Sequence, residues 1–262
     1  MNLLGYLKEV ISSILTFLTD LGAGVMMLWD AVLGIPSPNS RAFKRITAQM
    51  ALVGLESLPI VLITLLFGGM VLGLHTARQF VRFGASQFVG GLVAVSVARE
   101  VAPTLTGIVV AARIGSAFAA ELGSMRITNQ VDALRALAAN PVRYLVTPRL
   151  LASFVMLPVL TMFGNAMGLI GGGLVAISAG VSSQTFINSA TNYLRTYDVT
   201  GGLIKTAIFG IIIAITSCYI GLNTEGGAAG VGRSTTSAVV WSIVLLYAAN
   251  FVLSWLIWSL NG

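Results

Sequence analysis

Long apolar stretches constrain this chain more than any other feature of its sequence. Aliphatic residues, alanine and glycine dominate five stretches, at roughly 54–75, 88–118, 148–177, 202–222 and 236–258. A helix of about 20 apolar residues crosses the hydrocarbon core of a bilayer, whereas a soluble domain has no use for so many such runs. The sequence therefore predicts an all-α polytopic membrane protein with five transmembrane helices.

The composition fits this class and excludes others. Among the 262 residues, 56% are hydrophobic and 9% are charged, and the 29 glycines suit membrane helices that approach one another closely. The net charge of +6 is explained by basic residues at the cytoplasmic ends of spans, so no nucleic-acid partner is expected. One cysteine, Cys218, and one histidine, His75, predict neither an intrachain disulfide nor a metal site. No catalytic motif appears, and we expect no enzyme active site.

The first 45 residues form a separate unit, an N-terminal helix and a connector, before a transmembrane domain at 46–262. Polar residues from Lys8 to Asp20 recur at helical spacing, and leucine and isoleucine fill the other faces. This pattern is typical of an amphipathic helix at the membrane surface, and the alternative is a helix packed in the ordinary way against protein. The segment lacks the basic region and cleavage site of a signal peptide. We predict an interfacial helix.

The distribution of basic residues predicts the orientation in the membrane. Ten of the 15 lysines and arginines lie in the N-terminal segment, in residues 113–149 or in the 223–234 loop. Such an excess marks the cytoplasmic side. We therefore expect a cytoplasmic N-terminus and, after five spans, an external C-terminus.

A polar stretch, "AAELGSMRITNQVDALRALAANP", separates the second and third spans at 119–141. It predicts a short cytoplasmic helix that begins at an N-cap, Thr128, and ends at Asn140 and Pro141. Its apolar stripe is formed by Ile127, Val131, Leu134 and Ala138. The helix is too short and too polar to cross the membrane. It either packs only on its own bundle or docks on another cytoplasmic protein, and the spacing leaves both possibilities open.

Two further segments connect the later spans. Residues 181–198 predict a short external helix. Its apolar face is made by Phe186, Ile187, Ala190, Tyr193 and Leu194. The stretch "GAAGVGRS" at 227–234 comes close to a phosphate-binding loop, but Arg233 stands where lysine is required and no β-strand precedes it. We predict instead a tight glycine turn between the fourth and fifth spans.

Arg99 and Glu100 are unusual because apolar sequence flanks them on both sides. A charge at the centre of a membrane helix costs roughly 2.5–3.5 kcal/mol on insertion scales and normally faces protein or water. Adjacent helical residues point about 100° apart, so these two are not expected to be each other's partner. Pro103 removes the amide that would bond the Arg99 carbonyl, which predicts a kink. The pair either lines a polar cavity or sits at the outer interface with Arg99 snorkelling.

Glycines spaced by four recur in two of the predicted spans. They are Gly69 and Gly73 in the first span, and Gly164, Gly168 and Gly172 in the third. Small residues at this spacing allow helices to cross closely. The stripes predict either a homodimer interface or helix packing within one subunit.

Three blocks of the sequence resemble a known family. "AREVAPTLTGIVVAARIGSAFAAELGSM", "AAELGSMRITNQVDALRALAANPVRYLVTPR" and "GGAAGVGRSTTSAVV" resemble the signature of MlaE/YrbE permeases, the membrane subunits of MCE-associated ABC lipid transporters. The resemblance implies a subunit in the bacterial inner membrane that moves phospholipid between that membrane and a periplasmic MCE-domain carrier. It also implies a homodimer, cytoplasmic ABC ATPase subunits that bind the ATP, and a small STAS-type cytoplasmic subunit as an optional partner. No cofactor of its own is expected.

The same resemblance assigns roles to residues. The family's coupling helix, which contacts the ATPase, corresponds to Glu121, Met125, Arg126, Gln130, Val131, Asp132, Leu134 and Arg135. Its lipid-binding region corresponds to Arg99, Glu100, Leu72 and His75. The family usually has glutamate where this chain has Asn129, so the helix is expected to lose a first-turn acid worth about 0.3–1 kcal/mol. An ion-coupled secondary transporter and a non-transporting membrane anchor are the two alternatives.

Overall fold

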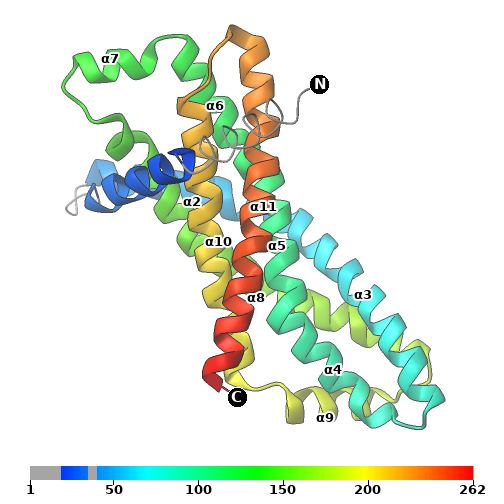
Figure 1. The fold of residues 1–262 in the computed structure, drawn as a ribbon. Helices are drawn as coiled ribbons and strands as arrows, with labels where there is room; N and C mark the ends of the chain where they lie inside the picture. The colour runs from blue at the N-terminus through cyan, green and yellow to red at the C-terminus, as the bar shows by residue number, and fades with distance from the viewer. Residues whose placement is uncertain (1–18, 35–39, 262) are drawn as a thin grey trace, which may run out of the picture.

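The protein is built from long helices, and the part of the chain that is described contains no strand (Figure 1). The computed structural model describes residues 19–34 and 40–261. A first helix covers residues 19–33. The later helices are α2 (Ser40–Gly54), α3 (Leu58–Arg82), α4 (Val89–Ser96), α5 (Ala102–Val110), α6 (Ser116–Ile127), α7 (Gln130–Ala136), α8 (Thr147–Ser178), α9 (Ser183–Tyr193), α10 (Thr196–Leu222) and α11 (Gly227–Asn261). The all-α prediction is confirmed.

Five helical stretches are long and apolar enough to cross a membrane, as predicted. They are Phe43–Arg82, Ser86–Ile127, Val142–Ser178, Thr196–Leu222 and Gly227–Ile257. Each is longer than the apolar run from which it was predicted, because the helices continue into polar sequence. The first span shows this at its end, where α3 includes Arg78 and Arg82.

The second span is interrupted twice by a π-helical turn. The first turn, η2 (Val97–Val101), carries Arg99 and Glu100, and the second, η3 (Ala111–Gly115), follows α5. Pro103 stands at the start of α5 and has no amide to bond the carbonyl of Arg99. The predicted kink therefore takes the form of a π turn, a feature that is frequent at functional sites.

Glycines bring α3 and α8 into backbone contact. A Cβ atom on Gly69 would overlap the carbonyl group of Gly168, and a Cβ atom on Gly73 would overlap that of Gly172. Any side chain at these positions would push the two helices apart. These glycines therefore serve packing within one subunit, which is one of the two uses that their spacing predicts.

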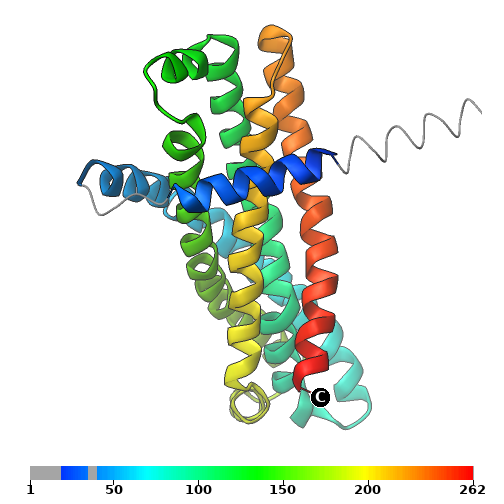
Figure 2. The same ribbon diagram turned by 60° about the vertical axis from the view of Figure 1, so that its left-hand side comes forward.

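The first described helix lies across the long helices rather than along them (Figure 2). The Tyr219 hydroxyl donates a hydrogen bond to the Asp20 carboxylate at 2.9 Å, and the Thr147 hydroxyl donates to the carbonyl of Ala31 at 2.9 Å. Trp29 and several other apolar side chains of this helix remain exposed. This placement fits an interfacial helix. The earlier part of the predicted helix, residues 1–18, lies outside the described residues.

The two short helices α7 and α9 lie at opposite ends of the bundle (Figure 1). α7 lies at the same end as the turn between α10 and α11, whereas α9 lies at the end where α11 finishes. A short helix is thus present between spans two and three and another between spans three and four, as predicted.

Both predicted ends of α7 are wrong. The Thr128 hydroxyl is not an N-cap but donates to the carbonyl of Ser124 at 2.7 Å, so it belongs to the end of α6. Asn129 and Ala138 have left-handed φ angles of 59° and 56°, which isolate α7 as a helix of seven residues. The side chain of Asn140 accepts a hydrogen bond at 2.9 Å from the amide of the second residue after it, at the start of the next helical segment.

The glycine-rich stretch after α10 is mostly helical, which corrects the predicted loop. α11 already begins at Gly227, and the reversal uses positive φ angles of 85° at Gly226 and 65° at Gly227. The hydroxyls of Thr224 and Ser234 meet at 2.8 Å across the turn. A tight glycine turn is thus present, but the later glycines belong to the helix.

The apolar face predicted for α9 is only partly buried. Phe186 packs into the core, whereas Ile187 and Tyr193 are exposed. α9 packs mainly on α4, where the amide of Gly91 donates to the Ser189 hydroxyl at 2.9 Å. The contact with α4 therefore uses a serine that the apolar pattern did not single out.

Candidate functional site

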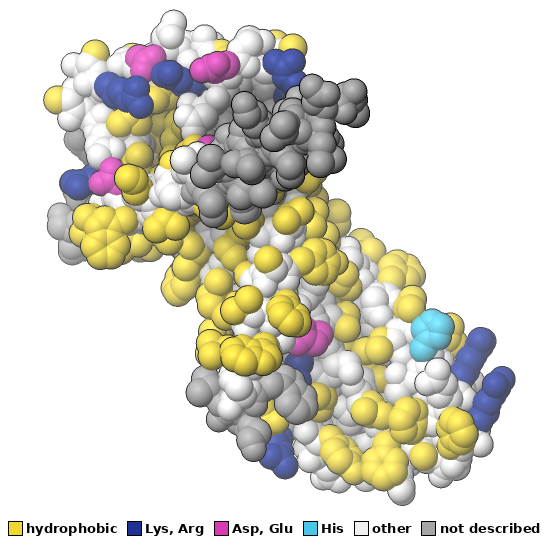
Figure 3. Space-filling view, in the orientation of Figure 1, with side chains coloured by type: hydrophobic (Ala, Val, Ile, Leu, Met, Phe, Trp, Pro, Cys, Tyr) yellow, Lys and Arg dark blue, Asp and Glu magenta, His cyan; other side chains and the backbone are white. Residues whose placement is uncertain are grey.

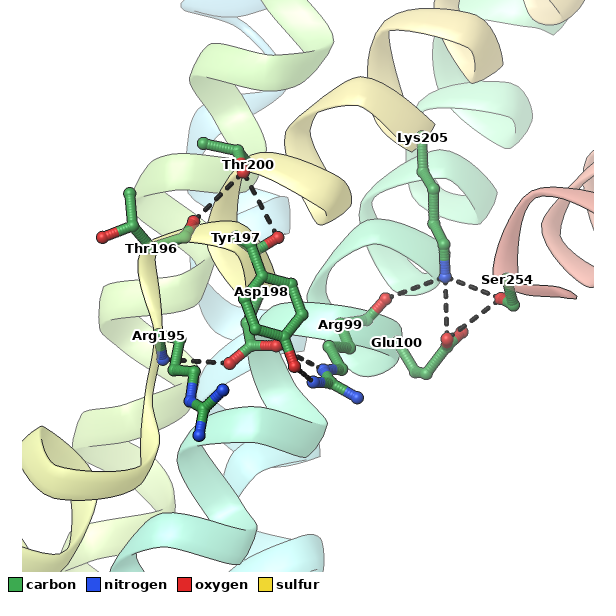
Figure 4. Close-up of polar contacts among 9 residues, drawn as sticks. All are labelled: Arg99, Glu100, Arg195, Thr196, Tyr197, Asp198, Thr200, Lys205 and Ser254. Carbon is green, nitrogen blue, oxygen red and sulfur yellow. Dashed lines mark hydrogen bonds and ion pairs between the residues drawn. The ribbon is translucent and has the colours of Figure 1, made fainter. Parts of the chain in front are cut away.

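A cluster of charged side chains surrounds the π turn η2 (Figure 4). Nε of Arg99 donates to Oδ1 of Asp198 at 2.5 Å. The same guanidinium donates to the Tyr197 hydroxyl and lies 5.1 Å from the centre of the Tyr197 ring. Asp198 is 1% exposed and also accepts the amide of Arg195 at 2.9 Å. Asp198, at the start of α10, therefore fixes the direction in which Arg99 points.

Glu100 points to different partners. Its carboxylate accepts hydrogen bonds from Nζ of Lys205 at 2.7 Å, from the Ser254 hydroxyl at 3.0 Å and from the Asn250 amide at 3.1 Å. Arg99 and Glu100 are thus not each other's partner, as expected from their spacing. Within this chain the carboxylate that bonds Arg99 is that of Asp198.

Lys205 links the two halves of the cluster. Its side chain is 4% exposed, and Nζ donates to Glu100, to the Ser254 hydroxyl at 2.7 Å and to the carbonyl of Arg99 at 3.1 Å. That carbonyl is the one whose usual helical donor Pro103 removes. An ammonium group has three donors, and here each has an acceptor.

The cluster presents two opposite charges to a small cavity. Arg99 is 23% exposed and Glu100 is 45% exposed, whereas their partners Asp198 and Lys205 are buried. The cavity has a volume of about 60 Å³. It is lined by Arg99, Glu100, Tyr197, Asp198, Gly201, Gly202, Lys205, Ser254 and Ile257. The four charged groups sum to zero, which reduces the cost of placing them among apolar helices.

Asp198 and Lys205 were not predicted as site residues. Lys205 was counted only as an external basic residue, although apolar sequence surrounds it within the fourth span. A lysine in that position is itself a sign of a functional site. Leu72 and His75, both predicted to contact lipid, belong to α3 and do not line this cavity.

At the opposite end, α7 is held against α6 by charged side chains. Nη1 of Arg126 reaches both carboxylate oxygens of Asp132 at 2.9 Å, and Arg135 bonds the same carboxylate at 3.1 Å. Below them, Nη2 of Arg149 meets Oε2 of Glu121 at 2.7 Å. The predicted coupling-helix residues therefore include three that bond to one another.

The exposed surface of α7 differs from the predicted one. Val131 is 2% exposed and Leu134 is partly buried, so two of the residues predicted to contact the ATPase are covered within this chain. Both pack against the core of their own subunit. Gln130, Asp132 and the 78%-exposed Leu137 remain accessible. Met125 is also partly buried.

Apolar side chains cover the surface between these two charged ends (Figure 3). The helix at 19–33 together with α10 and α11 lines an apolar groove of about 930 Å³. Large side chains on α11, such as Trp241, Phe251 and Trp255, are exposed. Such a surface suits contact with lipid chains or with another membrane helix, because apolar residues on a membrane protein face hydrocarbon at little cost.

Comparison with known proteins gives a consistent result. The sequence profile of the family described as "Permease MlaE" matches residues 46–256. The chain is 47% identical over 215 residues to a probable ABC transporter permease protein of Synechocystis sp., with 82% of each chain covered. It is 43% identical over 210 residues to one from Rickettsia prowazekii, covering 80% of this chain and 81% of that one. It is 44% identical over 207 residues to the chloroplastic protein Trigalactosyldiacylglycerol 1 of Arabidopsis thaliana, covering 79% and 59%.

Proposed function

This chain belongs to the MlaE permease family, and from this premise we propose that it moves phospholipid through the site around η2. It is a multi-pass permease subunit of an ABC transporter. Such a subunit has no nucleotide-binding domain and depends on a partner ATPase. Membership of this family therefore argues against both alternatives, an ion-coupled secondary transporter and a non-transporting membrane anchor.

The arrangement of charges carries the proposal. The cavity offers a cation, Arg99, and an anion, Glu100, each held by a buried partner of the opposite charge. A planar guanidinium binds phosphate through charge-assisted hydrogen bonds, and a carboxylate binds an amine. A zwitterionic phospholipid headgroup has both groups. Apolar helices around the cluster suit its acyl chains.

One relative supports a lipid as the cargo. The Arabidopsis relative is named after a lipid, trigalactosyldiacylglycerol. We infer a glycerophospholipid here because the cluster is charged on both sides, which a neutral sugar headgroup does not require. Leu72 and His75, on α3, remain predicted lipid contacts outside this cavity.

The remaining assembly follows from the family. We infer a homodimer in a bacterial inner membrane, with the α7 end cytoplasmic, the α9 end and C-terminus periplasmic, and an MCE-domain protein receiving or delivering lipid there. The ATPase would dock on α7 and bind the ATP, and a STAS-type subunit is an optional further partner. The exposed apolar face of α11 gives a second copy a surface to pack on.

The test is the lipid content and transport of the purified complex. We expect mass spectrometry to find phospholipid bound to the wild type, and Arg99→Ala to reduce its amount about tenfold, the size of effect expected when one charged hydrogen bond is lost. Arg82→Ala, another arginine outside the cavity, is the matched control and should keep its lipid. Normal lipid occupancy and transport in well-folded Arg99→Ala protein would contradict the proposal.

A further inference from the structure

An ion pair joins the two helices, α6 and α8, that precede and follow α7 in a helical hairpin. Glu121 lies in α6 before α7, and Arg149 lies at the start of α8 after it. Their ion pair at 2.7 Å joins the two arms of this hairpin, below the helix proposed to dock on the ATPase. Glu121 was predicted to contact the ATPase, but its observed partner belongs to this chain.

Arg149 is held in place by more than this ion pair. Its side chain is 4% exposed, Nη1 donates to the carbonyl of Leu145 at 2.6 Å, and the guanidinium lies 5.5 Å from the centre of the Phe118 ring. Glu121 is 54% exposed. A buried guanidinium without its carboxylate is unfavourable, so Arg149 holds Glu121, and hence α6, close to α8.

Further contacts extend from this ion pair to α7 on one side and to the lipid site on the other. Asp132 of α7 is bonded by Arg126 of α6, so a displacement of α7 is passed to α6. Thr147, at the start of α8, is bonded to the first described helix. α8 packs along α10, which carries Asp198 and Lys205 of the lipid site. α6 also packs on α10, and the ion pair adds a direct link between α6 and α8 to this shared packing.

We propose that Glu121 and Arg149 are positioning residues that make α6 and α8 move as one unit when the ATPase displaces α7. The pair thus sets how much lipid movement each ATP hydrolysis produces, rather than the affinity of the ATPase. This proposal rests on the proposed docking of the ATPase at α7. In this proposal Glu121 acts within the permease, and the exposed residues of α7 contact the ATPase.

The experiment measures lipid moved per ATP hydrolysed by the whole complex in proteoliposomes. In Glu121→Gln the shape is kept and the charge is lost. We expect the ATPase to bind as in the wild type and hydrolysis to stay within about twofold, while lipid per ATP falls about fivefold, as expected for a lost coupling interaction. Glu121→Asp should recover part of the ratio. Glu56→Gln removes an exposed acid whose partner, Arg113, is not buried, and should leave the ratio unchanged.

A charge-reversed pair distinguishes a positioning role of the ion pair from a role in protein stability alone. Glu121→Arg combined with Arg149→Glu rebuilds an ion pair and should restore most of the ratio, including in the case where Glu121→Gln alone does not accumulate. Three outcomes would overturn the proposal. The first is an unchanged ratio of lipid moved per ATP in Glu121→Gln, and the second is loss of the ATPase from an assembled Glu121→Gln permease. The third is a charge-reversed pair that fails to accumulate or does not restore the ratio. A wild-type complex that moves no lipid with ATP would instead contradict the proposed function.

Discussion

The charged residues around η2 and those at the base of the α7 hairpin form ion pairs of two different kinds. In both places a buried residue holds a more exposed one of opposite charge. Around η2 the buried residues are one acid and one base, Asp198 and Lys205, so the cavity receives both a cation and an anion. At the hairpin the buried residue is Arg149 alone, and only a carboxylate faces outward.

This difference separates a site that suits a ligand from one that suits a mechanical link. Two exposed charges of opposite sign can bind a zwitterion, while their buried partners keep the cluster neutral without it. At the hairpin only the Glu121 carboxylate is exposed, so there is no second charge for a zwitterion to bind. The ion pair instead links two helices directly. The predictions below test whether the two regions are as different as their geometry indicates.

The largest expected effect is all-or-none and concerns the side of the membrane on which each region lies. After Cys218→Ala, a cysteine placed at Leu137, directly after α7, or at Gln184 on α9 gives a labelling site at each end of the bundle. A membrane-impermeant thiol reagent added to intact cells with a permeable outer membrane should label Gln184→Cys and spare Leu137→Cys. Labelling of both, or the reverse pattern, would overturn the predicted orientation.

The next effect concerns docking. Leu137 is the most exposed large apolar side chain on the α7 hairpin, and burying it against the ATPase would remove apolar area from water. We expect Leu137→Asp to weaken ATPase binding about tenfold or more, measured by co-purification and by titration of purified subunits. Ile187→Asp, a matched change on exposed α9, should leave binding intact. If Leu137→Asp binds the ATPase as tightly as the wild type, the surface at the end of α7 is not the docking surface.

Another prediction compares the buried and the exposed member of one ion pair. Glu100→Ala removes the exposed member and leaves the Lys205 ammonium buried with fewer acceptors. Lys205→Met removes the buried charge and leaves Glu100 partly exposed and still bonded by Ser254 and Asn250. We expect Glu100→Ala to lower the free energy of unfolding more than Lys205→Met, by on the order of 2 kcal/mol. Denaturation of both variants in the same detergent measures the difference, and the opposite order would show that solvent exposure does not control these pairs.

Sequence reasoning found the elements of this fold because each depends on local pattern. Apolar length gave the five spans, and charge within an apolar run identified Arg99 and Glu100. Pro103 even predicted that the Arg99 carbonyl would lose its helical donor. The replacement donor, Lys205, could not be predicted in this way, because it lies on another helix and the pairing depends on how η2 and α10 pack.

The ends of helices were harder to predict for a different reason. Thr128 has the side chain of an N-cap, yet it closes α6, because a hydroxyl can bond a preceding carbonyl as well as a following amide. Which of the two it does depends on the backbone of its neighbour. The left-handed conformation of Asn129 decided the outcome here.

The smallest predicted effect tests that residue directly. Asn129 precedes the first turn of α7, so the expected loss of a first-turn acid is wrong: Asp132 already supplies one. Asparagine tolerates a positive φ better than most residues, whereas glutamate in that conformation is strained. We expect Asn129→Glu to lower the stability of the hairpin by about 1 kcal/mol, and Asn129→Gly to change it little. Hydrogen exchange at the amides of α7 gives this local free energy, which a global unfolding measurement would not resolve. Slower exchange in Asn129→Glu than in the wild type would mean that attraction of the acid to the helix dipole outweighs the backbone strain, and that charge rather than conformation determines how α7 is held in place.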